Sequence, residues 1–455
     1  MTQPDPAQGL GAAAQYPLVS ALTHRRSRRF AKGMTLNGGP LAYQSAEPPE
    51  PLTDAEEAAL AFAACGITGY ALGELAYDTG NVPDAGSGNV MSQFYARTAA
   101  SGDSIHADSL FVMNDKGTWL VRRPRELGPE ECARLAAAAR TGDILGFYRE
   151  ARVQVSSTRI DVKREIPFVP AFNNYSANRP GTTYFLPVHH MSAFYINVLL
   201  TAFNEEFGYY LVDDTSRFQP AGVKQFARSK GGHLYDAPAA GRTIPIGVLD
   251  TWMHEFAAIE QGAILQNLGL MTQALGLGGF AHFAHHPFAW FEALNFRMQQ
   301  DTFTKSVGMS APMRLLVKLM RREMDIRVPV GLEKDGEVLL RPFAPPYYKN
   351  MEEAVLAYVD AKYGANGTLT NLNGRSAFKD AETVARGIPR CSEKAVEATI
   401  AYCNYVYDRF GRFPATNGPF RTVLAYQAHH LDAAFYDRFY QDSALSETQR
   451  SHSHR

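Results

Sequence analysis

A cluster of guanidinium groups around one hydroxyl lies near the start of the chain, in the segment HRRSRRF from His24 to Phe30. Arg25 and Arg29 stand two residues on either side of Ser27, and on an extended backbone this alternation points all three side chains the same way. Forked guanidinium donors and a hydroxyl donor suit a phosphomonoester, which carries about two negative charges near neutral pH. The segment predicts a phosphate site; its plainer interpretation is a solvated basic run.

A long apolar helix that stops on a glycine cluster is the second feature, EQGAILQNLGLMTQALGLGGF from Glu260 to Phe280. Apolar residues recur at spacings of three and four and also occupy the other faces, which predicts a helix buried on most sides. Gly276 suits the left-handed residue that closes a helix, and Gly278 and Gly279 let the backbone approach a flat partner without a Cβ in the way. With the phosphate site, this helix predicts a phosphorylated, planar cofactor and therefore a flavoenzyme.

Histidine groups could carry other chemistry: His282, His285 and His286 form an H-x-x-H-H pattern, and residues 189–190 and 429–430 are pairs. A metal site needs imidazoles on one face with converging carboxylates or thiolates, and no HExxH motif or cysteine pair supports one. We therefore expect core or capping histidines and no metal. His285 or His286 is the expected proton donor beside a flavin, because the pKa of imidazole suits neutral pH.

Composition limits the class of protein. The chain has 455 residues, a formal charge of -1 and four widely spaced cysteines, so we expect neither nucleic-acid binding nor a disulfide framework. The N-terminus has no signal-peptide pattern, and no run approaches the length of a membrane span. These features predict a cytoplasmic protein that does not enter a membrane, built as one elaborated domain or as two to three domains.

The elements that must position the candidate residues follow from periodicity and from turn and capping residues. The segment from Asp408, dense in arginine and aromatics, is interpreted as helices packed on the core rather than as a lid over a substrate. The expected helices are 18–30, 53–66, 129–141, 185–203, 260–275, 314–324, 351–362, 392–410 and 422–440; the expected strands are 110–113, 119–122, 152–155 and two strands over 328–342.

Several segments resemble the FMN-dependent nitroreductase family. The Arg25-x-Ser27-x-Arg29 motif followed by an aromatic is similar to the N-terminal phosphate motif of that family. IEQGAILQNLGLMTQALGLGGF, from Ile259, is similar to its central dimer helix and the Leu-Gly-Leu-Gly turn that follows. LTDAEEAALAFAACGITGY, from Leu52, resembles the second helix region of members that oxidise heterocycles in modified peptides. In YYKNMEEAV, Lys349 stands where family members keep a basic residue before a helix.

The segment Arg97-Thr98-x-x-Ser101-Gly102 is similar to an Arg…Ser-x-Gly segment of the same members. The resemblance implies an α+β fold with a mixed central sheet flanked by helices, and a homodimer with FMN at the subunit interface. It places Phe283 and Ala284, with the two histidines after them, at flavin N5. Arg97 is the candidate cation at the pyrimidine edge. Ser101 and Gly102 either lie along the isoalloxazine or ribityl chain or form a turn before a strand.

The chain also departs from compact members of that family. We expect a disordered N-terminus over 1–17, an FMN-binding domain over 18–362 with an insertion at about 125–245, and a helical C-terminal extension over 363–445. The implied reaction transfers hydride through flavin N5 between NAD(P)H or an organic substrate and a second small-molecule acceptor. NAD(P)H would be a diffusing reductant, because GGHLYDAPAAGR is no dinucleotide fingerprint. The alternatives are a non-catalytic binding or accessory protein of this fold and a metal enzyme built on the histidine pairs.

Overall fold

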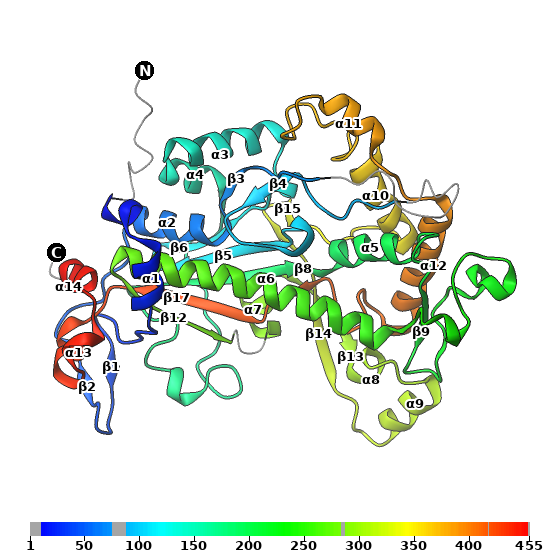
Figure 1. Cartoon of the computed structure of the whole chain (residues 1–455). Coiled ribbons are helices and arrows are strands. Elements are labelled where there is room, and N and C mark those ends of the chain that lie inside the picture. Colours follow the sequence, from blue (N-terminus) through cyan, green and yellow to red (C-terminus); the bar gives the residue numbers. More distant parts are fainter. Residues whose placement is uncertain (1–10, 75–87, 284–286, 417, 454–455) are drawn as a thin grey trace.

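The computed structural model describes residues 11–74, 88–283, 287–416 and 418–453. Its centre is a sheet with the strand order β12-β17-β8-β5-β6-β7, to which β16 adds by pairing with β8 (Figure 1). All its described pairs are antiparallel, so the expectation of a mixed central sheet is corrected. The strands are β5 (Asp108–Asn114), β6 (Gly117–Val121), β7 (Arg152–Ser156), β8 (Thr182–His190), β12 (Gly278–Phe283), β16 (Phe420–Arg421) and β17 (Leu424–His429).

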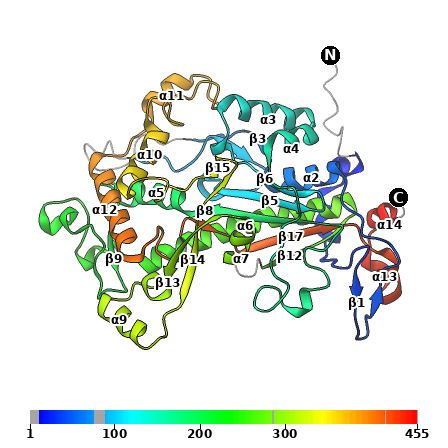
Figure 2. The same cartoon turned by 180° about the vertical axis from the view of Figure 1, so that it is seen from behind.

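Helices and smaller sheets surround this centre (Figures 1 and 2). The helices are α1 (Leu18–His24), α2 (Asp54–Cys65), α3 (Pro129–Thr141), α4 (Ile144–Ala151), α5 (Met191–Ala202), α6 (Ile246–Leu275), α7 (Pro287–Ala293), α8 (Phe303–Ser306), α9 (Ala311–Leu319), α10 (Met351–Tyr363), α11 (Ala381–Gly387), α12 (Glu393–Phe410), α13 (Ala433–Phe439) and α14 (Glu447–Ser453). The small sheets are β1 (Thr35–Leu36) with β2 (Tyr43–Gln44), β3 (Ile67–Tyr70) with β4 (Tyr95–Arg97), β9 (Tyr210–Asp213) with β10 (Gln219–Pro220) and β11 (Thr243–Pro245), and β13 (Arg297–Thr302) with β14 (Asp325–Lys334) and β15 (Glu337–Leu340).

The central sheet is covered on both faces, as the alternation along β5 shows. Leu110 and Val112 pack in a core with residues of α2, α4 and α6. Phe111 and Met113 point to the other face and pack with α7, β14 and β15. Because successive strand residues face opposite sides, a strand buried on both sides has apolar residues on both, as Leu110–Met113 of β5 shows. The chain thus combines helices with mainly antiparallel sheets, in the α+β manner expected.

The longest helix, α6, spans 30 residues and crosses the whole molecule (Figure 1). Its first half contributes Leu249 and Met253 to one buried cluster, and its second half contributes Ile264 and Leu268 to another. It begins earlier than expected, at Ile246, and ends where expected, because Gly276 closes it with a φ of 77°. The helix therefore contributes to both main cores and leads into β12.

Two expected helices are wrong because each is a strand followed by a helix. The stretch from Phe185 continues β8 and becomes α5 only at Met191, and the stretch from Thr422 forms β17 before α13 begins at Ala433. In both cases the strand half is apolar on either face, and that pattern does not separate a buried strand from a buried helix. The expected helix over 18–30 is wrong in its second half, because α1 ends at His24 and Arg28 instead forms a β-bridge with Gly279. The remaining expected helices and strands are present with ends shifted by a few residues.

The expected insertion and the expected C-terminal extension both contribute strands to the central sheet. Residues 125–245 include β8, which lies between β17 and β5, and residues 363–445 include β16 and β17 as well as α11, α12 and α13. Near the N-terminus, Gly11–Gln15 forms a 3-10 helix. Among the described residues, no helix combines the length and the apolar character that crossing a membrane requires.

Candidate functional site

The basic segment that follows α1 lies against β12, the strand that follows α6 (Figure 1). The backbone N–H of Arg28 donates to the carbonyl of Gly279 at 3.1 Å, which forms an isolated antiparallel bridge. A Cβ at Gly279 would lie 2.6 Å from the Tyr426 hydroxyl, so the close approach of β17 requires glycine there. The two sequence features that predicted a cofactor, distant in the chain, are thus neighbours in the fold.

An open cleft of about 450 Å³ lies between the basic segment, α6 and β12, and is called here the Arg25 cleft. Gly262 and Gly269 lie two turns apart on the α6 face that lines it. A Cβ at Gly262 would meet nothing within 4 Å, and one at Gly269 would lie 3.3 Å from Cδ of Arg25. The cleft is lined by Arg25, Arg26, Ser27, Gly262, Leu265, Gln266, Gly269, Gly279, Phe280, Ala281, His282, Phe283, Leu424 and Tyr426.

The polar end of the Arg25 cleft offers donors for an anion. Arg25, Arg26 and Ser27 are exposed. Among the described residues, no side-chain hydrogen bond engages the Arg25 guanidinium or the Ser27 hydroxyl, whereas Arg26 donates to the carbonyls of Thr23 and Arg25. Sequence reasoning missed Arg26, although it stands inside the basic run, and missed the seven-residue spacing of the two helix glycines, which was visible in the sequence.

Arg29 points away from the Arg25 cleft, which corrects the expectation that Arg25, Ser27 and Arg29 share one direction. Its guanidinium donates to Asn173 and to the Ser176 hydroxyl and stacks over the Phe280 ring with its carbon 4.6 Å from the centroid. It lines a second cleft of about 550 Å³, called here the Arg29 cleft, with Tyr175, Phe435 and Tyr436 among its walls. Ser27 and Arg26 line both clefts, so the two are adjacent.

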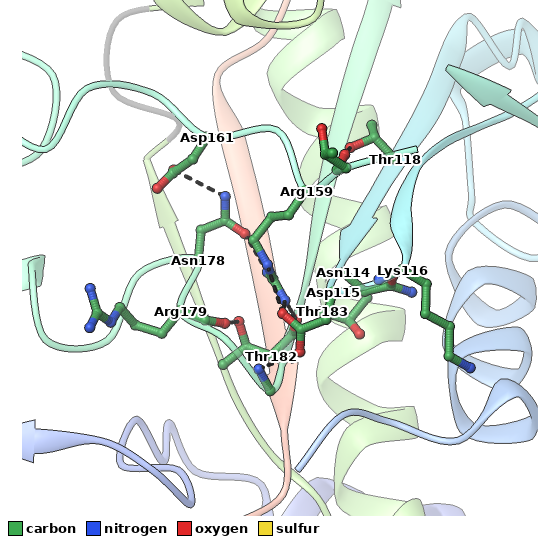
Figure 3. Close-up of polar contacts among 12 residues, drawn as sticks. Asn114, Asp115, Lys116, Thr118, Arg159, Asp161, Asn178, Arg179, Thr182 and Thr183 are labelled. Atoms are coloured by element: carbon green, nitrogen blue, oxygen red, sulfur yellow. Dashed lines mark hydrogen bonds and ion pairs between the residues drawn. The ribbon is translucent and has the colours of Figure 1, made fainter. Parts of the chain in front are cut away.

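A polar network fixes the loop that receives Arg29 (Figure 3). Arg159 donates to the Asp115 carboxylate at 2.8 Å, to the Asn178 side chain at 2.7 Å and to the Thr182 carbonyl at 2.6 Å. Gln427 of β17 accepts from the Asn178 backbone N–H at 2.6 Å and donates to the Ser176 carbonyl at 2.8 Å. The partners of Arg29 are therefore held by the central sheet.

Arg28 has a structural role between the ends of the chain. It is 4% exposed, and its guanidinium donates to the carbonyl of Ala444 at 2.8 Å and to the Gln273 side chain at 3.2 Å. Burial lowers the pKa of Arg28 from its ordinary value. These contacts join the basic segment to the end of α6 and to the segment before α14, which holds the polar wall of the Arg25 cleft in place.

Arg97, Ser101 and Gly102 lie around the first half of α6, outside the Arg25 cleft of the same chain. Arg97 is buried and donates to the carbonyls of Cys65 at 2.9 Å and Asp108 at 2.7 Å. The Ser101 hydroxyl donates to the Glu260 carboxylate at 2.5 Å. A Cβ at Gly102 would lie 2.6 Å from the Phe256 ring. The turn interpretation of this segment matches its 3-10 geometry over Gly102–Ser104.

Glu260 belongs to a buried carboxyl pair. The Asp108 backbone N–H donates to Glu260 at 2.8 Å, and the Asp108 carboxylate lies 3.0 Å from Nδ1 of His189. Burial, reinforced by the neighbouring Asp108 charge, raises the pKa of Glu260 to about 7. Burial also raises the pKa of Asp108 to about 6 and lowers that of His189 to about 4. The pair therefore holds a proton in conditions where free carboxyl groups have none.

The other predicted site residues lie in different parts of the fold. Gly278 packs against the end of β17, because a Cβ there would lie 2.3 Å from the Leu431 side chain. Phe283 is 64% exposed at the rim of the Arg25 cleft. Lys349 precedes α10, a helix that packs on α12 and α5, and it does not line the cleft. Ala284, His285 and His286 fall outside the described residues.

Two groups in the described chain have the ligand types of a metal site. Glu56, His430 and His452 bring their ligand atoms within 4.8 Å of one another, as do Asp108, His189 and Glu260. The pairs at 189–190 and 429–430 are buried, as expected for core histidines. His429 is one of these, and burial lowers its pKa to about 3, so its ring is neutral under ordinary conditions.

No family model and no curated protein match the chain. Three solved chains match it. One is a protein from Ralstonia eutropha JMP134 described as a "putative nitroreductase"; it is 12% identical, and the match covers 62% of this chain and 77% of that chain with a TM-score of 0.29. A TM-score this low carries no argument about fold or function, so the proposal that follows rests on the geometry of this chain.

Proposed function

We propose that the Arg25 cleft binds FMN and that the protein is an FMN-dependent oxidoreductase. The observation that supports this proposal is the contact of Arg28 with Gly279, which joins the basic segment to β12 beside the glycine-containing face of α6. FMN, when bound, supplies a centre that accepts and returns hydride at N5. Hydride would pass between NAD(P)H or an organic substrate and a second small-molecule acceptor in the same pocket.

The residues of the cleft fit both parts of such a cofactor. Arg25, Arg26 and Ser27 offer guanidinium and hydroxyl donors to a phosphate, in the charge-assisted geometry that phosphates favour. Gly262 leaves open space along α6, where a flat ring can lie against the backbone, and Gly269 lets the Arg25 side chain pack against the same helix face. Phe280 and Phe283 supply apolar surface at the far end of the cleft. Arg29, already engaged by Asn173 and Ser176, is assigned to positioning rather than to the phosphate.

A second copy of the chain would complete the site. Val248, Trp252 and Ile259 are 40%, 48% and 72% exposed and lie along one face of α6 that leads to Gly262. An exposed apolar helix face of this kind favours association. A partner docked there would cover these side chains and bring its own Ser101–Gly102 segment, which lies on α6 beside Phe256, toward the cleft. The proposed oxidoreductase is therefore a homodimer.

The test is an absorption spectrum of the purified protein, followed by titration of FMN into the chain freed of any chromophore. We expect stoichiometric FMN in the wild type and at least a tenfold weaker affinity in the Arg25→Ala/Arg26→Ala double variant. Lys318→Ala/Arg322→Ala, which removes two exposed positive charges outside the cleft, is the charge-matched control. If the double variant stays folded and keeps the wild-type affinity, the phosphate assignment is wrong. A colourless wild type that takes up no FMN would instead support the non-catalytic alternative.

A further inference from the structure

A cavity of about 360 Å³ lies apart from both clefts, between α5, α10 and the segments 91–95, 105–107 and 123–129. No residue that lines the Arg25 cleft or the Arg29 cleft also lines this cavity. Its volume falls in the range of small-molecule sites. It is called here the Lys362 cavity, and it is independent of the FMN proposal.

The charged groups of the Lys362 cavity are all cationic. Arg123, Arg125, Lys362 and Arg375 line it, and no aspartate or glutamate is among its described lining residues. Arg123 has a carboxylate partner, Glu126, and is buried. Within the described chain, Arg125, Lys362 and Arg375 form no ion pair. The cavity thus carries an excess of positive charge that an anion would offset.

Lys362 is the clearest case of a cation without an acidic partner among the described residues. It is 6% exposed, and its ammonium group donates to the side chain of Asn89, the carbonyl of Val90 and the side chain of Asn197 at 2.5, 2.7 and 2.6 Å. All three acceptors are neutral amide oxygens. Burial lowers the pKa of Lys362 to about 7. A buried charge that has hydrogen bonds but no counter-charge is costly, and a bound anion would reduce that cost.

The rest of the wall suits a flat apolar body. The Arg125 guanidinium carbon lies 4.6 Å from the Phe343 ring centroid and 4.8 Å from that of Tyr358, so the guanidinium is held at the cavity wall by two aromatic faces. Phe94 and Phe194 add further aromatic surface. A pocket that combines cationic groups with aromatic side chains suits a ligand that has a ring and an acidic substituent.

We propose that the Lys362 cavity is a second ligand site and that it binds an aromatic carboxylate. The carboxylate would lie among Arg125, Arg375 and Lys362, and the ring would pack against Phe194 and Phe343. Since Arg125 is the cation already stacked on two rings of the wall, it is the residue whose loss should weaken binding most.

The experiment is isothermal titration calorimetry of the full chain, saturated with FMN, using 2-naphthoate and its neutral analogue 2-naphthalenemethanol. We expect micromolar binding of 2-naphthoate and at least tenfold weaker binding of the alcohol. Arg125→Gln should weaken 2-naphthoate binding at least tenfold, whereas Arg140→Gln, on the exposed surface of α3 and outside the cavity, should leave it unchanged. Circular dichroism checks that each variant is folded, and Arg375→Gln is the second variant should Arg125→Gln fail to fold.

Three outcomes would overturn the proposal. In the first, 2-naphthoate does not bind at millimolar concentration. In the second, the protein binds the acid and the alcohol with equal affinity. In the third, the folded Arg125→Gln or Arg375→Gln variant binds 2-naphthoate as tightly as the wild type does. The Arg25→Ala/Arg26→Ala double variant separates this site from the FMN cleft, because it should keep the wild-type affinity for 2-naphthoate whether or not it binds FMN. A loss of 2-naphthoate binding in that double variant alone would place the ligand in the Arg25 cleft instead.

Discussion

Arg28 and Gly279 pair through their backbones, with a hydrogen bond of 3.1 Å that joins the segment after α1 to the distant strand β12. The residues on either side of Arg28 then have different surroundings. Ser27 lines both clefts, whereas Arg29 lines only the Arg29 cleft and donates to Asn173 and Ser176. One backbone contact thus determines which cations of the basic run are available to a ligand.

Filling the groove on α6 should remove FMN without unfolding the chain. Gly269→Leu would put a branched side chain where a Cβ alone already lies 3.3 Å from Arg25, so we expect at least a tenfold loss of FMN affinity. Gly269→Ala adds only the Cβ, against the flexible end of an arginine, and should cost much less. Fluorescence quenching of titrated FMN measures both. Wild-type affinity in Gly269→Leu would show that the ring does not lie along this helix face.

A charge on the exposed face of α6 should dissociate the proposed dimer. Ile259→Glu replaces the most exposed apolar side chain of that face, and burial of the new carboxylate in an interface would be costly. We expect light scattering to give a dimer for the wild type and a monomer for the variant. Leu319→Glu, an equally exposed position on α9, is the matched control and should remain dimeric. A monomeric wild type at micromolar concentration would contradict the prediction.

The buried Glu260–Asp108 pair predicts a loss of stability as the pH rises. Burial and the neighbouring Asp108 charge raise the pKa of Glu260 from 4.5 to about 7, and burial raises that of Asp108 from 3.8 to about 6. Between these values the pair binds more protons in the folded chain than in the unfolded chain, so its contribution to the free energy of unfolding falls as pH rises from about 4.5 to 7. Buried histidines with a lowered pKa, His189 and His429 among them, contribute in the opposite direction, so the pair's contribution is isolated by comparison with a Glu260 variant. Urea unfolding at pH 5 and 7.5 measures this.

Glu260→Gln should remove the contribution of this carboxyl group to the pH dependence, because an amide has no proton to release. From pH 5 to pH 7.5, we expect the change in unfolding free energy to be about 2 kcal/mol more positive in the variant than in the wild type. Glu255→Gln, an exposed carboxylate one turn earlier on α6, is the control. An unchanged slope in Glu260→Gln would mean that the carboxyl group is not protonated in the folded chain.

The C-terminal helix should be released when Glu56 loses its charge. The Glu56 carboxylate lies 3.0 Å from Nε2 of His452 and 3.5 Å from Nε2 of His430. Burial raises the pKa of Glu56, but hydrogen bonds with His430 and His452 outweigh it and hold that pKa below its ordinary value. Because the folded-state pKa is lowered, this stabilisation is present above about pH 4.5 and is lost as the pH falls.

Glu56→Gln tests this contact without removing the helix cap, because glutamine can replace glutamate in the capping box that Glu56 forms with Thr53. We expect a loss of about 2 kcal/mol in stability and faster tryptic cleavage after Arg450 in α14. Asp437→Asn removes the exposed ion pair of Arg450 instead and should cost under about 1 kcal/mol. Equal cleavage rates in the wild type and in Glu56→Gln would contradict the prediction.

Local signals in the sequence predicted much of the fold. Thr53 is the N-cap of α2, as one of the two residues expected to open that helix, and Gly276 ends α6 in the left-handed conformation expected of it. The turn at Asn114–Gly117 joins β5 and β6 as a hairpin. Each of these features depends on residues within a few positions of one another, so periodicity and capping rules suffice to find them.

The predictions that were wrong concern residues whose contacts are with residues distant in the sequence. β17 is a strand because β12 and β8 flank it, and the residues from Thr422 onward do not carry that information. Arg29 and Arg25 are equivalent by spacing, yet only Arg29 meets Asn173 and Ser176, which lie on a loop far along the chain. Local pattern therefore identified the basic segment and the glycine helix, but it could not tell which guanidinium groups already have partners.

The position of β17 has a consequence for the order of events during synthesis. In the central sheet β12 pairs with β17, and Tyr426 of β17 forms a wall of the Arg25 cleft. A nascent chain that has not yet reached Leu424 has Arg25, α6 and β12, but it has neither the strand on which β12 pairs nor that wall. The cleft therefore forms only after Leu424–His429 has been synthesised. Cofactor loading, as proposed, then follows the synthesis of β17.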